Sequence, residues 1–558
     1  MKRSTYKNEI ITEYIIAEKI ISLSMVENPR ILLHDYPRQA ILDNINFCTI
    51  KKGGYILLDF GEELCGGVVV TVHKTCAPNA KLRVVFGESV SEALSDIGEK
   101  NSGNDHSPRD FLLEVNNYST QRVGRTGFRF VKLESINVDI SISSLCAAFE
   151  HRDLLFKGSF ECSDKLLNKI WHTAARTVFL NMQDYLWDGI KRDRLVWIGD
   201  MHAEVSAISC VFGDCDIVTK TLDLTMETSP AGEWMNGIAS YSFWWIIILN
   251  DWYTYTGNKD YILKNSKYII THIKNIVDAI NYDGTNSFEC NLGYLEDSNP
   301  YKTYFVDWET YGTPDSCQGF YSLLMFALRA SSEICRVLEK HDLLRECIEK
   351  MGVIESMHFN VPSNRQIASL MSLAGLIDSE YVNNTILSKE PVADITAFLG
   401  YYTLIAKAKV GDTQGALDII KTYWGKMLEL GATSFWESFH YPSSHGACPI
   451  DRLPKENEKD IHGDFGAFCY KNFRASLCHG WACGPTPFLT SCVAGIRILE
   501  PGCKKLLIKP ELGYLDYVKV VYPTPYGDVK VLAQKTKNGI ELQVDAPPDI
   551  EIIKTTGN

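Results

Sequence analysis

The chain has 558 residues, of which 45% are apolar and 22% charged, and its formal net charge is −13. This length predicts two to four domains, and the composition excludes a disordered or fibrous chain. No run rich in Lys and Arg stands out, so we expect no nucleic-acid partner and no binding to an anionic membrane. The longest apolar run, Phe243–Leu249, is too short to cross a bilayer.

The seventeen cysteines form no C-x-x-C pair, and such a scattered, odd set is typical of free thiols in a reducing compartment. The chain starts with Met1 and two basic residues, but Glu9 and Glu13 interrupt the apolar core that a signal peptide would need. We therefore expect a cytoplasmic protein. The thirteen histidines show no metal-ligand spacing, so no metal and no cofactor are expected, and a homo-oligomer is left open.

Residues 1–157 read as β-structure. Short runs rich in β-branched and aromatic residues alternate with glycine-containing turns, as in a sandwich of strands. The expected strands are 55–60, 67–72, 81–86 and 127–133. The polar segment 89–109 contains Gly and Pro and is expected to be a long exposed loop.

The hydrophobic period changes to that of helices after Ser163. Ser163 and Asp164 can cap a helix in which Leu166 and Ile170 keep i, i+4 spacing. Further helices are expected at 200–211, 216–228, 239–256, 259–280, 315–340, 343–357, 366–374, 378–388, 394–408, 413–430 and 483–496. About a dozen helices without a sharp sequence repeat predict a toroid of six helical hairpins over residues 158–497.

The last segment, residues 498–558, returns to β-structure. Its expected strands are 504–509, 517–521, 529–534 and 540–544. A segment this short is too small to be secure alone, so we expect it to pack on the helical domain.

All eleven tryptophans lie between Trp171 and Trp481. Indole rings pack on the apolar faces of sugars, so this distribution is typical of a carbohydrate cleft; a large aromatic core of helices would produce the same distribution and stays open. Motifs of zinc proteases, P-loop enzymes, serine hydrolases and dinucleotide-binding proteins are missing from the sequence. The remaining chemistry is that of carboxylates and aromatic rings.

The densest patch of such residues runs from Trp187 to Glu204. It holds four acids, three basic residues and two tryptophans within eighteen residues. Gly189 and Gly199 permit tight turns, and Asp200 is expected to cap the following helix. The alternative is a surface loop of mutually neutralising charges, which has no need of the tryptophans.

A second patch, residues 431–439, places Glu437 next to Trp436 directly after a helix end. Aromatic surroundings raise the pKa of a carboxyl and suit proton transfer, although a helix-terminal Glu beside a core Trp is the common explanation of such a pattern. Two separated carboxylates, one acid and one base, are what a glycosidase needs.

Residues 188–200, DGIKRDRLVWIGD, resemble the signature loop of the family 78 α-L-rhamnosidases. Further motifs follow in the family's order: LDFGEE at 58–63, FGE at 86–88, FVDW at 305–308, FWE at 435–437, SLCHGW at 476–481 and YPTPYG at 522–527. The resemblance implies a multidomain α+β fold, with an (α/α)6 barrel flanked by an N-terminal β-sandwich and a small C-terminal one. It also implies hydrolysis of terminal α-L-rhamnosides with inversion.

The resemblance further implies a role for each matching residue. Asp193 falls on the general-acid position and Glu437 on the general-base position. The residues that would bind the sugar are Asp188, Arg192, Trp197, Asp200, Trp252, Trp308, Trp436 and His479.

One position departs from the family pattern. The family's acid is usually Glu, and Asp193 is one methylene shorter, so either the loop lies closer to the substrate or Glu204 is the acid. The extra N-terminal carbohydrate-binding sandwiches of many relatives are not found in this sequence, which favours small, already imported rhamnose-containing glycosides or oligosaccharides as substrates.

Two other classes of function stay open. A lyase with the same barrel would need a different base, and a phosphorylase would need a basic phosphate pocket. Only Arg192 and Arg194 favour such a pocket. A glycan-binding protein without activity is made plausible only by the shortened acid.

Overall fold

The computed structural model describes residues 10–43, 45–293, 295–296 and 298–556. The expected interruption of a signal core falls partly on residues 1–9, outside the described part. The chain forms two compact units, each built from three stretches. Unit 1 consists of residues up to 153 with 179–195 and 426–479, and unit 2 consists of 154–178, 196–425 and 480–558.

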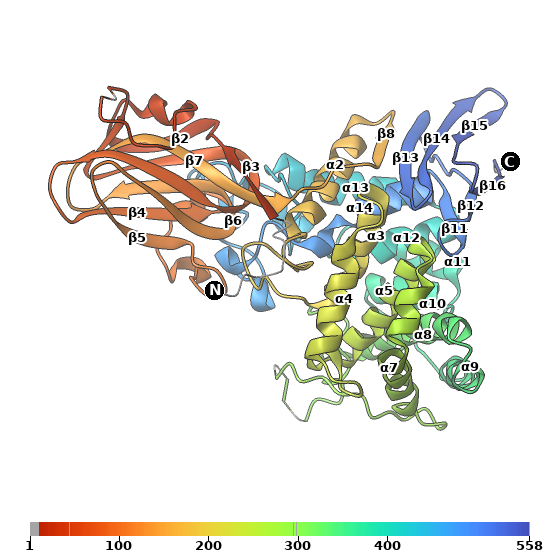
Figure 1. The fold of residues 1–558 in the computed structure, drawn as a ribbon. Helices are drawn as coiled ribbons and strands as arrows, with labels where there is room; N and C mark the ends of the chain where they lie inside the picture. The colour runs from red at the N-terminus through yellow and green to blue at the C-terminus, as the bar shows by residue number, and fades with distance from the viewer. Residues whose placement is uncertain (1–9, 44, 294, 297, 557–558) are drawn as a thin grey trace. The chain divides into compact units, whose positions relative to one another are not determined.

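A seven-stranded sheet forms the N-terminal part of unit 1 (Figure 1), with the strand order β1-β7-β3-β6-β4-β5 and β2 paired with β3. Its strands are β1 (Ile10–Ile15), β2 (Lys19–Glu27), β3 (Cys48–Thr75), β4 (Ala80–Gly87), β5 (Asp110–Val115), β6 (Ser119–Ser135) and β7 (Ile140–Arg152). The predicted strands 55–60 and 67–72 both lie within β3, which changes register around Gly66. A Cβ atom on Gly66 would come within 2.1 Å of the Ala148 carbonyl oxygen, so only glycine allows this close approach.

The prediction of a long exposed loop at 89–109 is wrong in its first part. Ser89 caps the short helix α1 (Val90–Leu94) by accepting a hydrogen bond from the Glu92 amide, and Glu92 is buried. The buried guanidinium of Arg109 donates to the carbonyl oxygens of Phe86, Glu92 and Ser95. Buried charges that bond to main-chain groups hold this segment against the sheet.

Unit 2 contains the helices. They are α2 (Lys165–Asn181, its last turn in unit 1), α3 (His202–Val211), α4 (Asp216–Thr228), α5 (Ala239–Thr256), α6 (Lys259–Lys264), α7 (Ser266–Asp278), α8 (Pro314–Val337), α9 (His341–Glu355), α10 (Arg365–Ala374), α11 (Ser379–Val382), α12 (Gly400–Lys409), α13 (Thr413–Glu429, its end in unit 1) and α14 (Pro485–Phe488). As predicted, the Asp164 carboxylate accepts from the Leu166 amide at the start of α2.

Four of the expected helices differ in the structure. The helix predicted at 259–280 divides at Asn265 into α6 and α7, and the segment 378–388 combines α11 with a π-helical turn. The helix predicted at 394–408 begins only at Gly400. The segment 483–496 is α14 followed by another π-helical turn, and Ile496 already belongs to a strand.

The C-terminal strands form two small sheets in unit 2. One has the order β11 (Ile496–Glu500), β12 (Lys505–Ile508) and β16 (Glu551–Lys554); the other has β15 (Gly539–Asp545), β14 (Gly527–Thr536), β13 (Tyr517–Thr524) and β8 (Ser159–Cys162). The fold is therefore mixed, with β-rich parts at both ends of the chain and helices between them.

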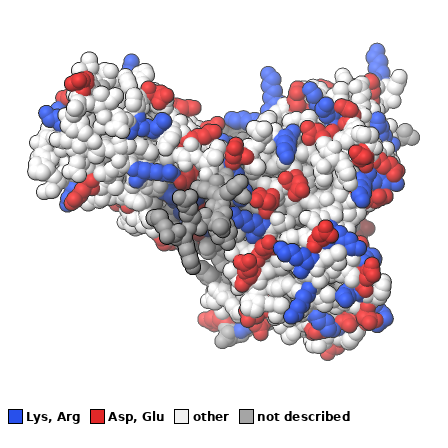
Figure 2. Space-filling view, in the orientation of Figure 1, with Lys and Arg blue, Asp and Glu red and all other residues white. Residues whose placement is uncertain are grey.

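Charges of both signs are mixed on the visible face of the molecule (Figure 2). Among the described residues, no helix combines the length and the apolar character that crossing a membrane requires.

Candidate functional site

The segment 188–195 is a closed loop in unit 1. The Asp188 amide donates to the Leu195 carbonyl at 3.1 Å, and the Leu195 amide donates to the Asp188 carboxylate at 2.9 Å. Asp193 and Arg194 both have left-handed backbone conformations, with φ of 56° and 55°. This backbone conformation raises the conformational energy of residues other than glycine, and strain of this kind concentrates at functional sites.

Arg192 joins the two patches that were singled out in the sequence. Its guanidinium donates to Asp193 at 3.0 Å through Nη1 and to the Glu437 carboxylate through Nη2. The Arg192 Nε atom donates to the Arg474 carbonyl at 3.1 Å, so the guanidinium is fixed on three sides. The two carboxylates predicted as acid and base therefore share one cation.

Glu437 is buried and is held at both carboxylate oxygens. Oε1 accepts from Arg192, and Oε2 accepts from the Ser476 amide at 2.8 Å. Burial raises the pKa of Glu437, and the Arg192 charge opposes that rise. A carboxylate that binds protons more readily than usual and is held by a neighbouring cation can serve as a general base.

His479 lies between two carboxylates of unit 1. Its Nε2 atom is 3.8 Å from Asp188 and 3.8 Å from Glu437. Burial, assisted by the Arg192 charge, lowers the pKa of His479 well below its usual value. The imidazole is therefore neutral at physiological pH, and the structure brings it together with Asp188, Arg192, Asp193 and Glu437.

Sequence reasoning missed His106, whose Nδ1 atom lies 3.3 Å from the Asp193 carboxylate. His106 comes from the polar segment that was predicted to be an exposed loop, and nothing in its local pattern points to Asp193. The indole of Trp187 lies under Arg194, whose guanidinium carbon is 4.6 Å from the ring centroid. The patch is not a surface loop of neutralising charges, because Asp188, Lys191 and Arg192 are buried.

Three other predicted residues meet in unit 2 around Tyr241. The Tyr241 hydroxyl donates to the Asp200 carboxylate at 3.0 Å, and the Tyr241 ring contacts the edge of Trp197. Tyr241 also contacts Phe305, which in turn packs against Trp308. Asp200 does not cap α3 as predicted: Met201 occupies that position, and no side chain caps the helix.

Glu204 and Trp252 lie elsewhere in unit 2. Glu204 is fully buried on α3 against Gly480, where an added Cβ would lie 2.1 Å from the Glu204 carboxyl carbon. Trp252 packs on Tyr255 and lines a cavity of about 310 Å³. The structure does not join Trp252 to the residues around Tyr241.

The tryptophans divide between core and site. Trp171, Trp244, Trp245 and Trp424 are fully buried core side chains, so the aromatic-core reading holds for them. Trp436 is also buried and packs on Phe439, and no described group bonds to its indole nitrogen.

Asp307 is a buried acid of unit 2 that sequence reasoning passed over in favour of the neighbouring Trp308. Its carboxylate accepts from the Trp308 amide at 2.7 Å and contacts the Thr396 hydroxyl at 3.3 Å. Burial raises the pKa of Asp307 to about 6. The FVDW run was the available signal.

Two family models match the chain. The bacterial α-L-rhamnosidase six-hairpin glycosidase domain matches residues 156–315, and the bacterial α-L-rhamnosidase C-terminal domain matches residues 495–553. An α-L-rhamnosidase of Formosa agariphila is 21% identical over 92% of this chain, and one of Alteromonas sp. is 22% identical over 91%. The chain spans 56% of the length of each of these curated relatives.

A solved structure has a similar fold. The family 78 rhamnosidase of Bacillus sp. GL1 has a TM-score of 0.74 and 20% identity to this chain, covering 95% of it and 56% of the solved chain. At this identity the likeness shows the fold alone. The two domain models, the curated relatives and this fold make the chain similar to the α-L-rhamnosidases of glycoside hydrolase family 78.

Proposed function

We propose that this protein is an α-L-rhamnosidase: an inverting glycoside hydrolase that releases terminal L-rhamnose from small glycosides or oligosaccharides. The proposal includes an (α/α)6 barrel at residues 158–497, between a β-sandwich at 1–157 and a small β-sandwich at 498–558. The six-hairpin description of the matched family model supports the barrel. The seventeen cysteines are free thiols, which supports a reducing, cytoplasmic location.

One observation carries the proposal: Arg192 bonds to both Asp193 and Glu437. An inverting glycosidase needs an acid on one side of the scissile bond and a base on the other, with room for a water molecule. Asp193 is partly accessible, with 19% of its side chain exposed, whereas Glu437 is buried. The two groups therefore differ in environment, as two carboxyl groups with opposite duties should.

The reaction follows from these assignments. Asp193 donates a proton to the glycosidic oxygen as the bond to the anomeric carbon breaks. Glu437 removes a proton from a water molecule, whose oxygen attacks the opposite face of that carbon. Arg192 keeps Glu437 ionised before the attack and stabilises the charge on Asp193 after its proton has left.

Sugar recognition is assigned to polar and aromatic residues of each unit. In unit 1, we assign the hydrogen bonds to sugar hydroxyl groups to Asp188 and His479, and an apolar contact to Trp436. In unit 2, Asp200, Trp197 and Trp308 form a connected group through Tyr241 and Phe305. Trp252, in its separate cavity, has the weakest support.

The test begins with turnover of an aryl α-L-rhamnoside by the purified protein, followed by NMR. Inversion predicts β-L-rhamnose as the first sugar product. The near-isosteric Glu437→Gln variant should fold and lose kcat by about 10²–10⁴-fold, because the base is absent. Loss of less than tenfold, or α-L-rhamnose as the first product, would contradict the assignment of Glu437.

A further inference from the structure

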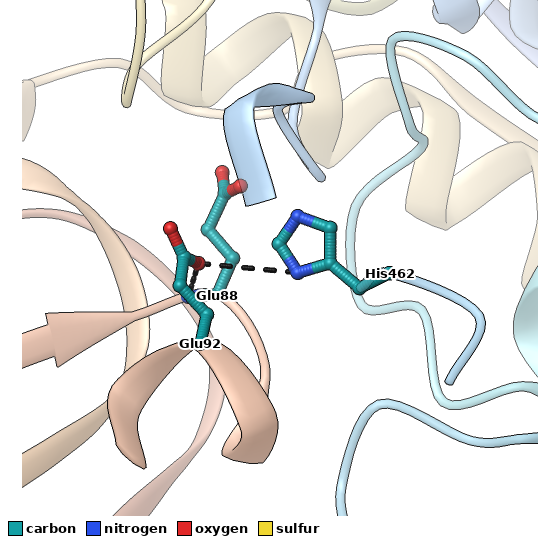
Figure 3. Close-up of side chains that lie close together, drawn as sticks. All are labelled: Glu88, Glu92 and His462. Atoms are coloured by element: carbon teal, nitrogen blue, oxygen red, sulfur yellow. Dashed lines mark hydrogen bonds and ion pairs between the residues drawn. The ribbon is translucent and has the colours of Figure 1, made fainter. Parts of the chain in front are cut away.

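Four buried side chains of unit 1 form a charged cluster that the proposed reaction does not use. They are Glu88 directly after β4, Glu92 on α1, Lys191 on the loop 188–195, and His462 after the short strand β10 (Lys459–Asp460). Figure 3 shows the two carboxyl groups and the imidazole facing a common space. We call these four residues the Lys191 cluster.

The cluster is centred on the Lys191 ammonium and not on a metal ion. Glu88, Glu92 and His462 offer ligand atoms within 4.8 Å of one another. The Lys191 Nζ atom lies 2.9 Å from Glu88 and 3.1 Å from Glu92, so the ammonium takes the position that a cation would need. Burial lowers the pKa of Lys191, but the two carboxylates outweigh burial and raise it, which keeps the ammonium charged.

His462 is a neutral, fixed member of the cluster. Burial, assisted by Lys191, lowers its pKa to about 4. Its Nε2 atom lies 3.0 Å from the Ala475 carbonyl, which can only accept, so Nε2 carries the proton. The Nδ1 atom then accepts from the Ser89 hydroxyl at 2.8 Å.

Every member except Glu92 also bonds directly to the backbone segment 473–477 or to its side chains. Lys191 donates to the carbonyls of Phe473 and Ala475 at 2.9 and 2.7 Å. Glu88 accepts from the Leu477 amide at 2.6 Å and from the Ser476 hydroxyl at 3.1 Å. These bonds fix both ends of the segment.

This segment holds the proposed base. The Ser476 amide donates to Glu437 Oε2 at 2.8 Å, and the Glu437 amide donates to the Ser476 carbonyl at 3.0 Å. Ser476 therefore bonds to both acids, to Glu88 through its hydroxyl and to Glu437 through its amide. Lys191 stands two residues before Asp193, so the same cluster anchors the loop that carries the proposed acid.

We propose that Glu88 and Lys191 are positioning residues for the hydrolysis: Glu88 fixes the Ser476–Leu477 backbone that orients the base Glu437, and Lys191 anchors both this backbone and the loop of the acid Asp193. The N-terminal sheet thereby contributes to the alignment of the reacting groups. This inference rests on the proposed function. Displacement of a reacting group by about 1 Å can lower the rate by about 10²-fold, so loss of these positioning contacts should reduce kcat.

The experiment compares Glu88→Gln and Lys191→Met with the wild type on an aryl α-L-rhamnoside. We expect kcat to fall by about 10- to 100-fold in each variant, with KM changed by less than about threefold. In Glu88→Gln the Ser476 amide no longer holds Glu437 firmly. Since that bond lowers the pKa of Glu437, the acid limb of kcat should move to higher pH.

Asp110→Asn is the matched control. Asp110 is also a carboxylate of the N-terminal sheet, paired with Arg83 at 2.6 Å, but it is not a member of the Lys191 cluster. Its kcat and acid limb should equal those of the wild type. If Glu88→Gln fails to fold, Ser476→Ala removes only the hydroxyl bond to Glu88 and should still lower kcat severalfold.

A crystal structure of Glu88→Gln separates this inference from the proposed function. We expect Ser476 N and Glu437 Oε2 to lie beyond hydrogen-bond distance, whatever the wild-type protein hydrolyses. A retained bond together with an unchanged kcat would overturn the inference. A displaced Glu437 in a protein whose wild type shows no rhamnosidase activity would uphold the structural link and reject the proposed function.

Discussion

Arg192 is the residue on which the proposed chemistry depends, because one buried guanidinium serves two carboxylates. Removing a buried cation from two acids leaves uncompensated charge, which is costlier than the bonds themselves. Asp193, exposed enough to meet a leaving group, also contacts His106. In the proposed reaction Asp193 gives up a proton and Glu437 takes one, and Arg192 contacts both groups.

Asp193→Asn tests the acid. A general acid matters most for a poor leaving group, so hydrolysis of alkyl or disaccharide rhamnosides should fall by about 10²–10³-fold. A nitrophenyl rhamnoside, whose leaving group departs with little protonation, should lose less than about tenfold. Initial rates on both substrates measure the difference.

Glu204→Gln is the comparison for that prediction. Glu204 is fully buried on α3, so we expect its variant to show no dependence on the leaving group. Should Glu204→Gln discriminate between leaving groups and Asp193→Asn not, the acid would be Glu204.

Residue types singled out the two patches that contain Asp188, Arg192, Asp193 and Glu437, and the resemblance to family 78 added His479. Asp188, Arg192, Asp193, Glu437 and His479 were named from the sequence and lie together in the structure. His106, Ser476 and the Lys191 cluster could not be found in this way. Their roles depend on contacts between segments that lie far apart in the chain, and a single sequence carries no local trace of such contacts.

Helix starts are decided by side chains that local periodicity does not reveal. Thr396 accepts from the Leu399 amide and donates to Gln366 on α10. These bonds hold residues 394–399 outside a helix, so α12 begins at Gly400 although the apolar pattern starts earlier. By contrast, the Asp164 cap of α2 is a local signal, and its prediction is confirmed.

Asp307 connects the segment before α8 with the segment before α12 and should impose a pH dependence on stability. Burial raises its pKa to about 6 in the folded protein, from an ordinary value of 3.8. The folded state therefore binds the proton more tightly, and stability falls as pH rises from about 4 to about 6. The gap corresponds to at most about 3 kcal/mol.

Asp307→Asn should remove this pH-dependent loss of stability, because the amide keeps the shape of the side chain but does not ionise. The Tm of the variant should rise relative to that of the wild type between pH 4 and pH 7, as followed by calorimetry. A constant difference across this range would contradict the prediction.

Asp412→Asn provides a control of opposite sign. Burial raises the pKa of Asp412, but its ion pair with Lys407 at 2.6 Å and its hydrogen bonds from Gly415 and Asn383 together outweigh burial and lower it. Asp412→Asn should therefore lose Tm relative to the wild type as pH rises from the acid side.

Each compact unit of the molecule combines stretches that lie far apart along the chain. Unit 1 combines the N-terminal sheet with residues 179–195 and 426–479. The contacts within it span the chain: the Val90 amide donates to the Ile450 carbonyl at 2.8 Å, and Arg129 donates to the Gly431 carbonyl at 3.0 Å. Composition and period placed the change from β-structure to helix near residue 157, but they could not indicate that later segments return to the first unit.

A cut in the chain near that change should therefore leave the protein in one piece. Leu155 is 81% exposed, so a protease site inserted after it should be accessible. After cleavage the two fragments should co-elute in gel filtration and retain most of the activity, because Glu88, Glu92 and Arg129 on one fragment bond to partners on the other. The two fragments should separate only in denaturant.

The same cut in a Lys191→Met background should release the N-terminal fragment at lower denaturant concentration, because two buried carboxylates have lost their shared cation. Elution of the N-terminal fragment alone in native buffer would mean that residues 1–157 form an independent domain.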